Sequence, residues 1–60
     1  MAQFEIRKAS NEQFFWVFQG NNNEVICTSE TYRRKDSATN SIQVVKTQAA
    51  SASINDRSGS

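Results

Sequence analysis

The chain has 60 residues, with seven Lys and Arg, six Asp and Glu, one Cys, no His and no Pro, and a formal net charge of +1. Sixty residues permit one small domain, which on folding buries only about 60% of the surface that its unfolded chain exposes, so added stabilisation is expected. The lone Cys excludes an internal disulfide, and the absence of His excludes Ser-His and Cys-His nucleophile pairs and His-based metal sites.

The composition also bears on location and partners. No apolar run approaches the roughly 18 residues that a membrane span needs. The first residues lead directly into Glu5 and Arg7 without a basic-then-apolar export signal, and one free Cys favours a reducing compartment. We therefore expect a cytoplasmic protein with no membrane partner, no cofactor and no catalytic activity.

Residues 3–8 alternate between apolar and polar side chains. Phe4 and Ile6 share one face, and Glu5 and Arg7 share the other. This period of two predicts a strand with one face toward water.

Residues 13–19 are aromatic and β-branched, which predicts a second strand. One face carries Phe14, Trp16 and Phe18, and the other carries Phe15 and Val17. Pairing Ile6 with Phe14 or with Trp16 places the apolar face of the first strand beside the aromatic trio. This register collects more apolar surface than a one-residue slip, so it is the one expected.

A turn over residues 20–23 leads into a third strand over residues 24–29. Gly and Asn tolerate the positive φ values that tight hairpins need. A two-residue turn at Asn22-Asn23 pairs Phe18 with Cys27 and Gly20 with Val25. Val25 and Cys27 then join the aromatic face, with Cys27 in the core as a packing residue.

Residues 31–35 link this strand to a helix that begins after an N-cap at Asp36 or Ser37 and reaches about Gln48. Its apolar stripe, predicted to cover the sheet, is Ala38, Ile42, Val45 and Ala49. Val44 lies nearly opposite the stripe. After Ala50, Ala52 and Ile54 alternate with polar residues, which is consistent either with a strand or with a frayed tail.

Several motifs coincide with those of a known family. They are Phe4-Glu5-Ile6, the aromatic strand at 14–18, Glu24-Val25-Ile26, Thr28-Ser29-Glu30-x-Tyr32, and the helix pattern Lys35-x-Ser37-Ala38-x-Asn40-x-Ile42-x-x-Val45-Lys46. Over residues 4–46 the chain resembles the YegP-like family of small uncharacterised bacterial proteins. The resemblance implies a β-β-β-α-β unit that forms homodimers or tandem repeats, in which two units build one sheet and exchange C-terminal strands. It implies no activity, substrate or catalytic residue.

We therefore predict an α+β fold. It consists of a three-stranded antiparallel meander, one helix on one face and a C-terminal strand exchanged with a second copy to form one continuous sheet. Residues 1–50 are expected to form a single YegP-like domain, and residues 51–60 to be the exchanged strand or a flexible tail.

Two groups of residues are candidate sites. Phe15 and Val17 form an apolar pair that nothing in one short chain is left to cover, so together with Ile54 they are candidates for a dimer interface. Plain exposure and ligand stacking are the alternatives for this pair.

The second candidate is the basic run Arg33, Arg34 and Lys35, which precedes the helix and could bind an anion or nucleic acid. The alternative is a solvated loop whose charges are neutralised by Glu30 and Asp36. The favoured function is a homodimeric structural or interaction module without catalysis, and the second hypothesis is a weak nucleic-acid or anion binder.

Overall fold

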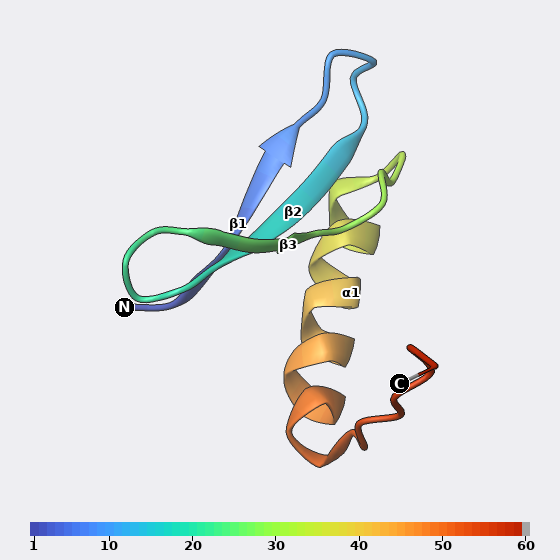
Figure 1. Ribbon diagram of the computed structural model, residues 1–60. Coiled ribbons are helices and arrows are strands. Elements are labelled where there is room, and N and C mark those ends of the chain that lie inside the picture. Colours follow the sequence, from blue (N-terminus) through green and yellow to red (C-terminus); the bar gives the residue numbers. More distant parts are fainter. Residues whose placement is uncertain (60) are drawn as a thin grey trace.

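A computed structural model describes residues 1–59 of the chain (Figure 1). Strands β1 (Gln3–Lys8), β2 (Phe14–Gln19) and β3 (Val25–Thr28) form an antiparallel sheet in the order β1-β2-β3. Helix α1 (Lys35–Gln48) crosses one face of this sheet and ends in a short 3₁₀ turn, Ala49–Ser51. The α+β meander with one helix is therefore confirmed. Residues 52–59 form neither helix nor strand, so the described chain lacks the fourth strand of the expected unit.

The register of β1 against β2 is the one expected from the apolar pattern. Ile6 lies opposite Trp16, and Phe4 lies opposite Phe18. The Phe4 ring meets Trp16 edge-on at 5.3 Å between centroids and Phe18 at 4.8 Å. Aromatic pairs at such distances add stabilisation beyond the burial of their area.

The pairing of β2 with β3 departs from the expected pattern after one residue. Phe18 lies opposite Cys27 as predicted, but Val25 pairs with Gln19 rather than with Gly20, because a bulge intervenes. Since side chains alternate along a strand, this shift removes Val25 from the aromatic face. The predicted placement of Val25 in the core is wrong, and its side chain is 44% exposed.

The cause of the bulge is the turn that precedes β3. The Gly20 N–H donates to the Glu24 carbonyl at 2.9 Å, and the Asn23 N–H donates to the Gly20 carbonyl at 3.0 Å. Asn23 has φ 64°, so it supplies the left-handed residue that closes a three-residue hairpin loop. The two-residue turn expected at Asn22-Asn23 is therefore wrong by one residue.

Helix α1 begins earlier than its sequence predicts. Arg34, with φ −119°, is the N-cap and makes no side-chain capping bond, so the assignment of the cap to Asp36 or Ser37 is wrong. The Asp36 carboxylate instead accepts two bonds from the Arg34 guanidinium, both 3.0 Å long. The end of the helix at Gln48 is confirmed.

The core lies between the first half of α1 and the middle of the sheet. Ala38 is 0% exposed and Ile42 is 7% exposed, and both pack against Trp16. The Trp16 Nε1–H donates to the Ser41 hydroxyl at 2.6 Å, and that hydroxyl donates to the Ala38 carbonyl at 2.8 Å. This chain of bonds joins the indole of the central strand to the helix.

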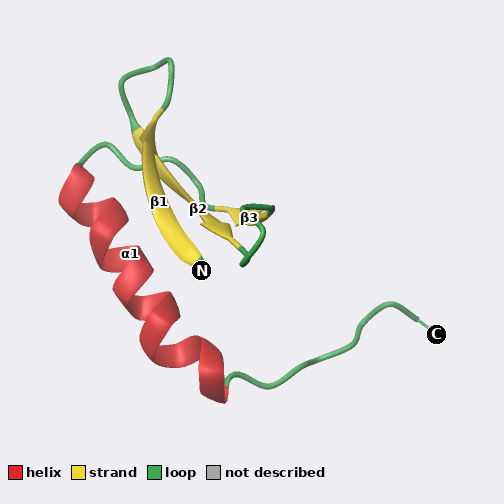
Figure 2. Ribbon diagram, turned by 90° about the vertical axis from the view of Figure 1, so that its left-hand side faces the viewer, coloured by secondary structure: helices red, strands yellow, loops and turns green. Residues whose placement is uncertain are grey.

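The second half of α1 extends beyond the sheet. Val45 is half-buried, and Ala49, the last position of the predicted apolar stripe, is exposed. Figure 2 shows the segment after the helix leaving on the side of α1 that carries the sheet, without joining it. The described chain therefore does not cover the end of the helix or the neighbouring sheet edge.

Candidate functional site

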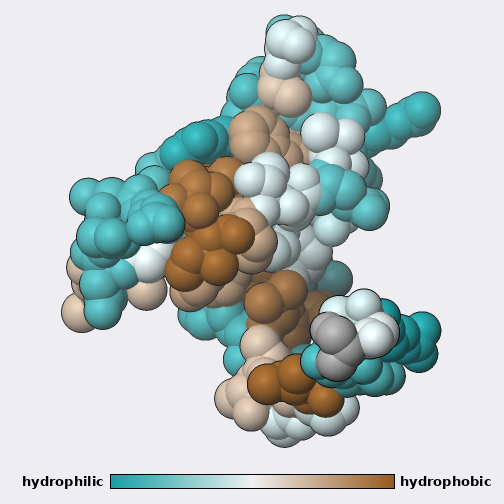
Figure 3. Space-filling view, in the orientation of Figure 1, coloured by the Kyte–Doolittle hydropathy of each residue, from teal (hydrophilic) through white to brown (hydrophobic). Residues whose placement is uncertain are grey.

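An apolar groove lies between the open end of the sheet and the C-terminal end of α1. Its volume is about 400 Å³, and its lining residues are Phe4, Phe18, Cys27, Val45, Lys46, Ala49 and Ala50. Figure 3 shows brown apolar surface on both sides of the hollow between the sheet and the lower part of the molecule. We refer to this feature as the apolar groove.

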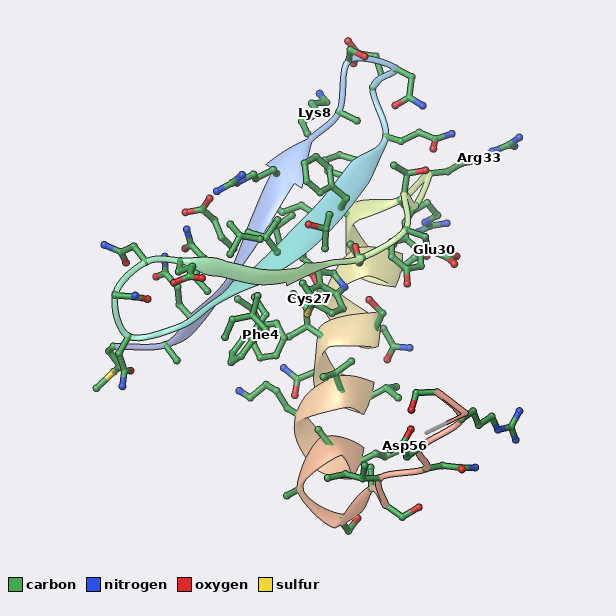
Figure 4. All side chains as sticks on the ribbon, in the orientation of Figure 1. Phe4, Lys8, Cys27, Glu30, Arg33 and Asp56 are labelled. Atoms are coloured by element: carbon green, nitrogen blue, oxygen red, sulfur yellow. The ribbon has the colours of Figure 1, made fainter. Side chains whose placement is uncertain are left out.

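The sheet side of the apolar groove is a single cross-strand row. Phe4 in β1 lies opposite Phe18 in β2, which lies opposite Cys27 in β3. Residues directly opposite one another place their side chains on the same face, so the three strands contribute one side chain each. In Figure 4, Phe4 and Cys27 both lie on the side of the sheet that faces the helix.

The helix side of the apolar groove is made of small residues. Val45, Ala49 and Ala50 cannot bridge the space between the diverging helix and sheet, and only Lys46 brings a charge. As a result Cys27 is exposed rather than buried. Cys27 was predicted to pack in the core. It lies on the predicted face of the sheet, but the prediction of its burial is wrong, because α1 no longer covers the sheet at this end.

The other face of β2 is less open than expected. Val17 is 2% exposed, although α1 lies on the opposite side of the sheet. Glu5 and Thr28 lie directly opposite Val17 on the neighbouring strands, and such cross-strand side chains shelter a short residue in a central strand. The expectation that nothing covers Val17 is wrong, whereas Phe15 is half-buried.

Ile54, the third residue predicted for an interface, is the opposite case. Its side chain is 98% exposed in the segment that follows the 3₁₀ turn. The structure does not bring it near Phe15 or Val17 through any contact within the chain.

The basic run occupies the approach to α1. Arg34 is engaged by Asp36, and this ion pair holds the pKa of the Asp36 carboxyl below its usual value, mainly through the hydrogen bond from the guanidinium. Arg33 points away from the body of the molecule in Figure 4. Lys35 lines a separate shallow hollow with Lys8 and Phe14.

This arrangement does not form a concentrated anion site. Asp36 neutralises Arg34, as the solvated-loop alternative anticipates, and Lys8 pairs with Glu12 at 3.4 Å. Within residues 1–59 no group of three His, Cys, Asp or Glu side chains is arranged to hold a metal ion. In that same part of the chain no helix is long and apolar enough to cross a membrane.

Sequence reasoning missed two features of the packing between α1 and the sheet. One is the bond between Trp16 and Ser41, for which a polar residue between Ala38 and Ile42 on the helix was the available signal. The other is the apolar groove, which depends on where α1 diverges from the sheet and has no local sequence signature.

A family model described as a domain of unknown function, DUF1508, matches residues 9–56. The chain belongs to this family. The resemblance to the YegP-like family of uncharacterised proteins is thereby confirmed, and curated relatives of this DUF1508 chain support it.

Two of these relatives are longer than the DUF1508 chain described here. A UPF0339 protein of Shewanella oneidensis is 46% identical over 46 residues, which cover 77% of this chain and 42% of the relative. A UPF0339 protein of Pseudomonas aeruginosa is 42% identical over 45 residues, covering 75% and 41% respectively. The chain thus spans about two fifths of the length of these relatives.

A solved structure has the same fold at similar size. The solution structure of a protein from Haloferax volcanii matches with a TM-score of 0.82 and 25% identity, covering 92% of this chain and 93% of the other. The fold of one sheet and one helix therefore occurs in a chain that is little more than one such unit.

Proposed function

We propose that this DUF1508 chain is a homodimeric structural or interaction module without catalytic activity, in which residues 51–59 of each copy extend onto the other; position 60 of the predicted tail lies outside the described residues. The observation that carries the proposal is the apolar groove, an open apolar surface in a chain whose Ile54 side chain is also exposed. Contiguous exposed apolar surface is one of the features that mark protein contacts.

The small core supports the same proposal. The buried hydrophobic residues among those described are Trp16, Val17, Ala38 and Ile42. Large hydrophobic side chains that stay exposed are Met1, Val25, Ile26, Val44 and Ile54. A domain of this size gains stability by moving such side chains from water into a contact with a second copy.

Sedimentation equilibrium of the full chain over a micromolar concentration range tests the proposal. We expect the mass of two copies, with dissociation only on dilution. A folded chain that remains monomeric at the highest concentration would contradict it. Phe15→Glu, compared with Gln43→Glu on the exposed side of α1, reports whether the outer face of β2 belongs to the contact.

The basic run supplies no comparable support for an anion-binding function, because the Arg34 side chain already forms an ion pair with Asp36. Binding of oligonucleotides that weakens with added salt and with Arg33→Glu would favour that alternative.

A further inference from the structure

The apolar groove has the composition of a small-molecule pocket. Its volume of about 400 Å³ falls within the range of about 300–1,000 Å³ that is usual for ligand pockets. Such pockets have mostly apolar and aromatic walls and a few polar groups that orient the ligand. The groove has this pattern, because the rings of Phe4 and Phe18 and the small side chains of the helix end form its walls, and Lys46 is its one charged member.

The charge of Lys46 is not paired within the described chain. The ion pairs of residues 1–59 join Arg7 to Glu5, Lys8 to Glu12 and Arg34 to Asp36, and Lys46 belongs to none of them. Lys46 lies in the last turn of α1. A lysine in an apolar lining lays its aliphatic stem along the surface and keeps its ammonium group in water. The groove therefore offers an apolar wall and a single cation that is available to a ligand.

The aromatic wall of the groove is held in place by contacts within one copy. The Phe4 ring meets Trp16 edge-on at 5.3 Å between centroids and lies 4.8 Å from the Phe18 ring. Phe4, Phe18 and Val45 also pack against the core cluster. A wall that is already ordered loses little conformational entropy when a ligand binds.

We infer that the apolar groove binds a single-chain alkyl carboxylate, with its chain between the aromatic rings and the helix end and its carboxylate beside Lys46. One negative head group matches the one cation of the lining, and an unbranched apolar tail matches the rest. A methylene group is similar in size to a water molecule, whose share of the liquid is about 30 Å³, so the groove holds a chain of about eight to ten carbons. Both chains of a membrane lipid exceed this volume, which favours a free carboxylate.

Binding of the carboxylate also affects assembly, and this part of the inference rests on the proposed homodimer. The ligand and the second copy use the same surface, so they compete for it. A ligand that binds only the free groove shifts the equilibrium toward the single copy by mass action. The alkyl carboxylate thus regulates the contact between copies.

Titration of the ¹⁵N-labelled full chain with hexanoate, octanoate and decanoate, each below its micelle concentration, tests the binding by chemical shift. Each added methylene group that is buried should tighten binding about fourfold, until the chain outgrows the groove. Octanol, which lacks the charge, should bind about two- to fivefold more weakly than octanoate. No saturable shifts around Phe4, Phe18 and Cys27, or equal affinity for octanol and octanoate, overturns the inference.

Two substitutions test the assignment of the groove residues. Lys46→Gln should weaken octanoate binding about two- to fivefold and leave octanol binding unchanged. Lys35→Gln, on the same helix but in a separate hollow, is the matched control and should bind octanoate normally. Ala49→Phe fills the groove from an exposed position and should weaken both ligands at least tenfold, with circular dichroism confirming the fold. Equal weakening of octanoate binding by the two lysine variants overturns the role of Lys46.

Cys27 separates the ligand site from its effect on assembly, because it is an exposed thiol in the groove lining. In the most dilute sample, saturating octanoate should slow its reaction with an aromatic disulfide reagent several-fold, and an unchanged rate overturns the ligand site while leaving the homodimer. In concentrated samples, sedimentation equilibrium should show a shift toward one copy as octanoate is added. Slowed reaction with an unchanged dimer overturns the competition alone. Slowed reaction in a chain that is always monomeric supports the ligand site and contradicts the homodimer.

Discussion

Replacing Ser41 by Ala tests the polar link between sheet and helix. The Ser41 hydroxyl accepts a bond of 2.6 Å from Trp16 Nε1, and Trp16 is only 7% exposed. Leaving a buried donor unpaired costs about 1–3 kcal/mol. Ala has the higher helix propensity, which returns up to about 0.5 kcal/mol. We therefore expect a net loss of about 0.5–2.5 kcal/mol in the free energy of unfolding.

Urea unfolding followed by circular dichroism at one protein concentration measures this loss. The control is Thr39→Ala, which makes a similar change of propensity at an exposed position where the hydroxyl bonds only to the Lys35 carbonyl of its own helix. The Trp16→Phe variant completes a double-mutant cycle, because it removes the other partner. If Ser41→Ala is as stable as Thr39→Ala, or if the two Ser41 and Trp16 changes are additive, the link contributes nothing.

Two further predictions concern the turn and the helix start. Asn23→Val should destabilise the fold by about 1–2 kcal/mol, because a β-branched residue resists the positive φ of 64°, whereas Asn23→Gly should be neutral or stabilising, and urea unfolding compares them. The lowered pKa of Asp36 contributes stability above the pKa of its unfolded form and loses it as pH falls through the folded pKa. Below about pH 4 the free energy of unfolding should therefore fall less steeply with decreasing pH in Asp36→Asn than in the unaltered chain. The same pH dependence in both proteins would contradict this role of Asp36.

The register of β1 on β2 could be predicted because both strands have a strong apolar face. A slip of one residue would move Phe4 and Ile6 away from the aromatic row, so burial selects one pairing. Here one dominant energy term, the burial of apolar side chains, acts over several consecutive residues.

The bulge in β3 could not be predicted with the same security. After Gly20 come three Asn residues, each able to adopt a positive φ, so local chemistry allows several turn lengths. The structure uses Asn23, and that choice moves Val25 to the other face. A difference of one turn residue thus changes which side chains face the helix.

Burial at Val17 and exposure at Cys27 depend on distant geometry. Val17 is sheltered by side chains of neighbouring strands, and Cys27 is exposed because α1 diverges from the sheet. A pattern of apolar and polar residues predicts which face of the sheet a side chain lies on. It does not predict how far the helix or the neighbouring strands extend over that face. The candidate interaction surface is therefore the apolar groove together with Ile54, rather than Phe15 and Val17.

Contacts between copies are tested most directly by nuclear magnetic resonance on a mixture of ¹³C-labelled and unlabelled chains, which records nuclear Overhauser effects across the interface alone. We predict intermolecular effects from the Ile54 methyl groups of one copy to the rings of Phe4 and Phe18 of the other. A folded sample in which those rings contact only their own chain, with the Ile54 methyl groups at random-coil shifts, would contradict self-association through the apolar groove.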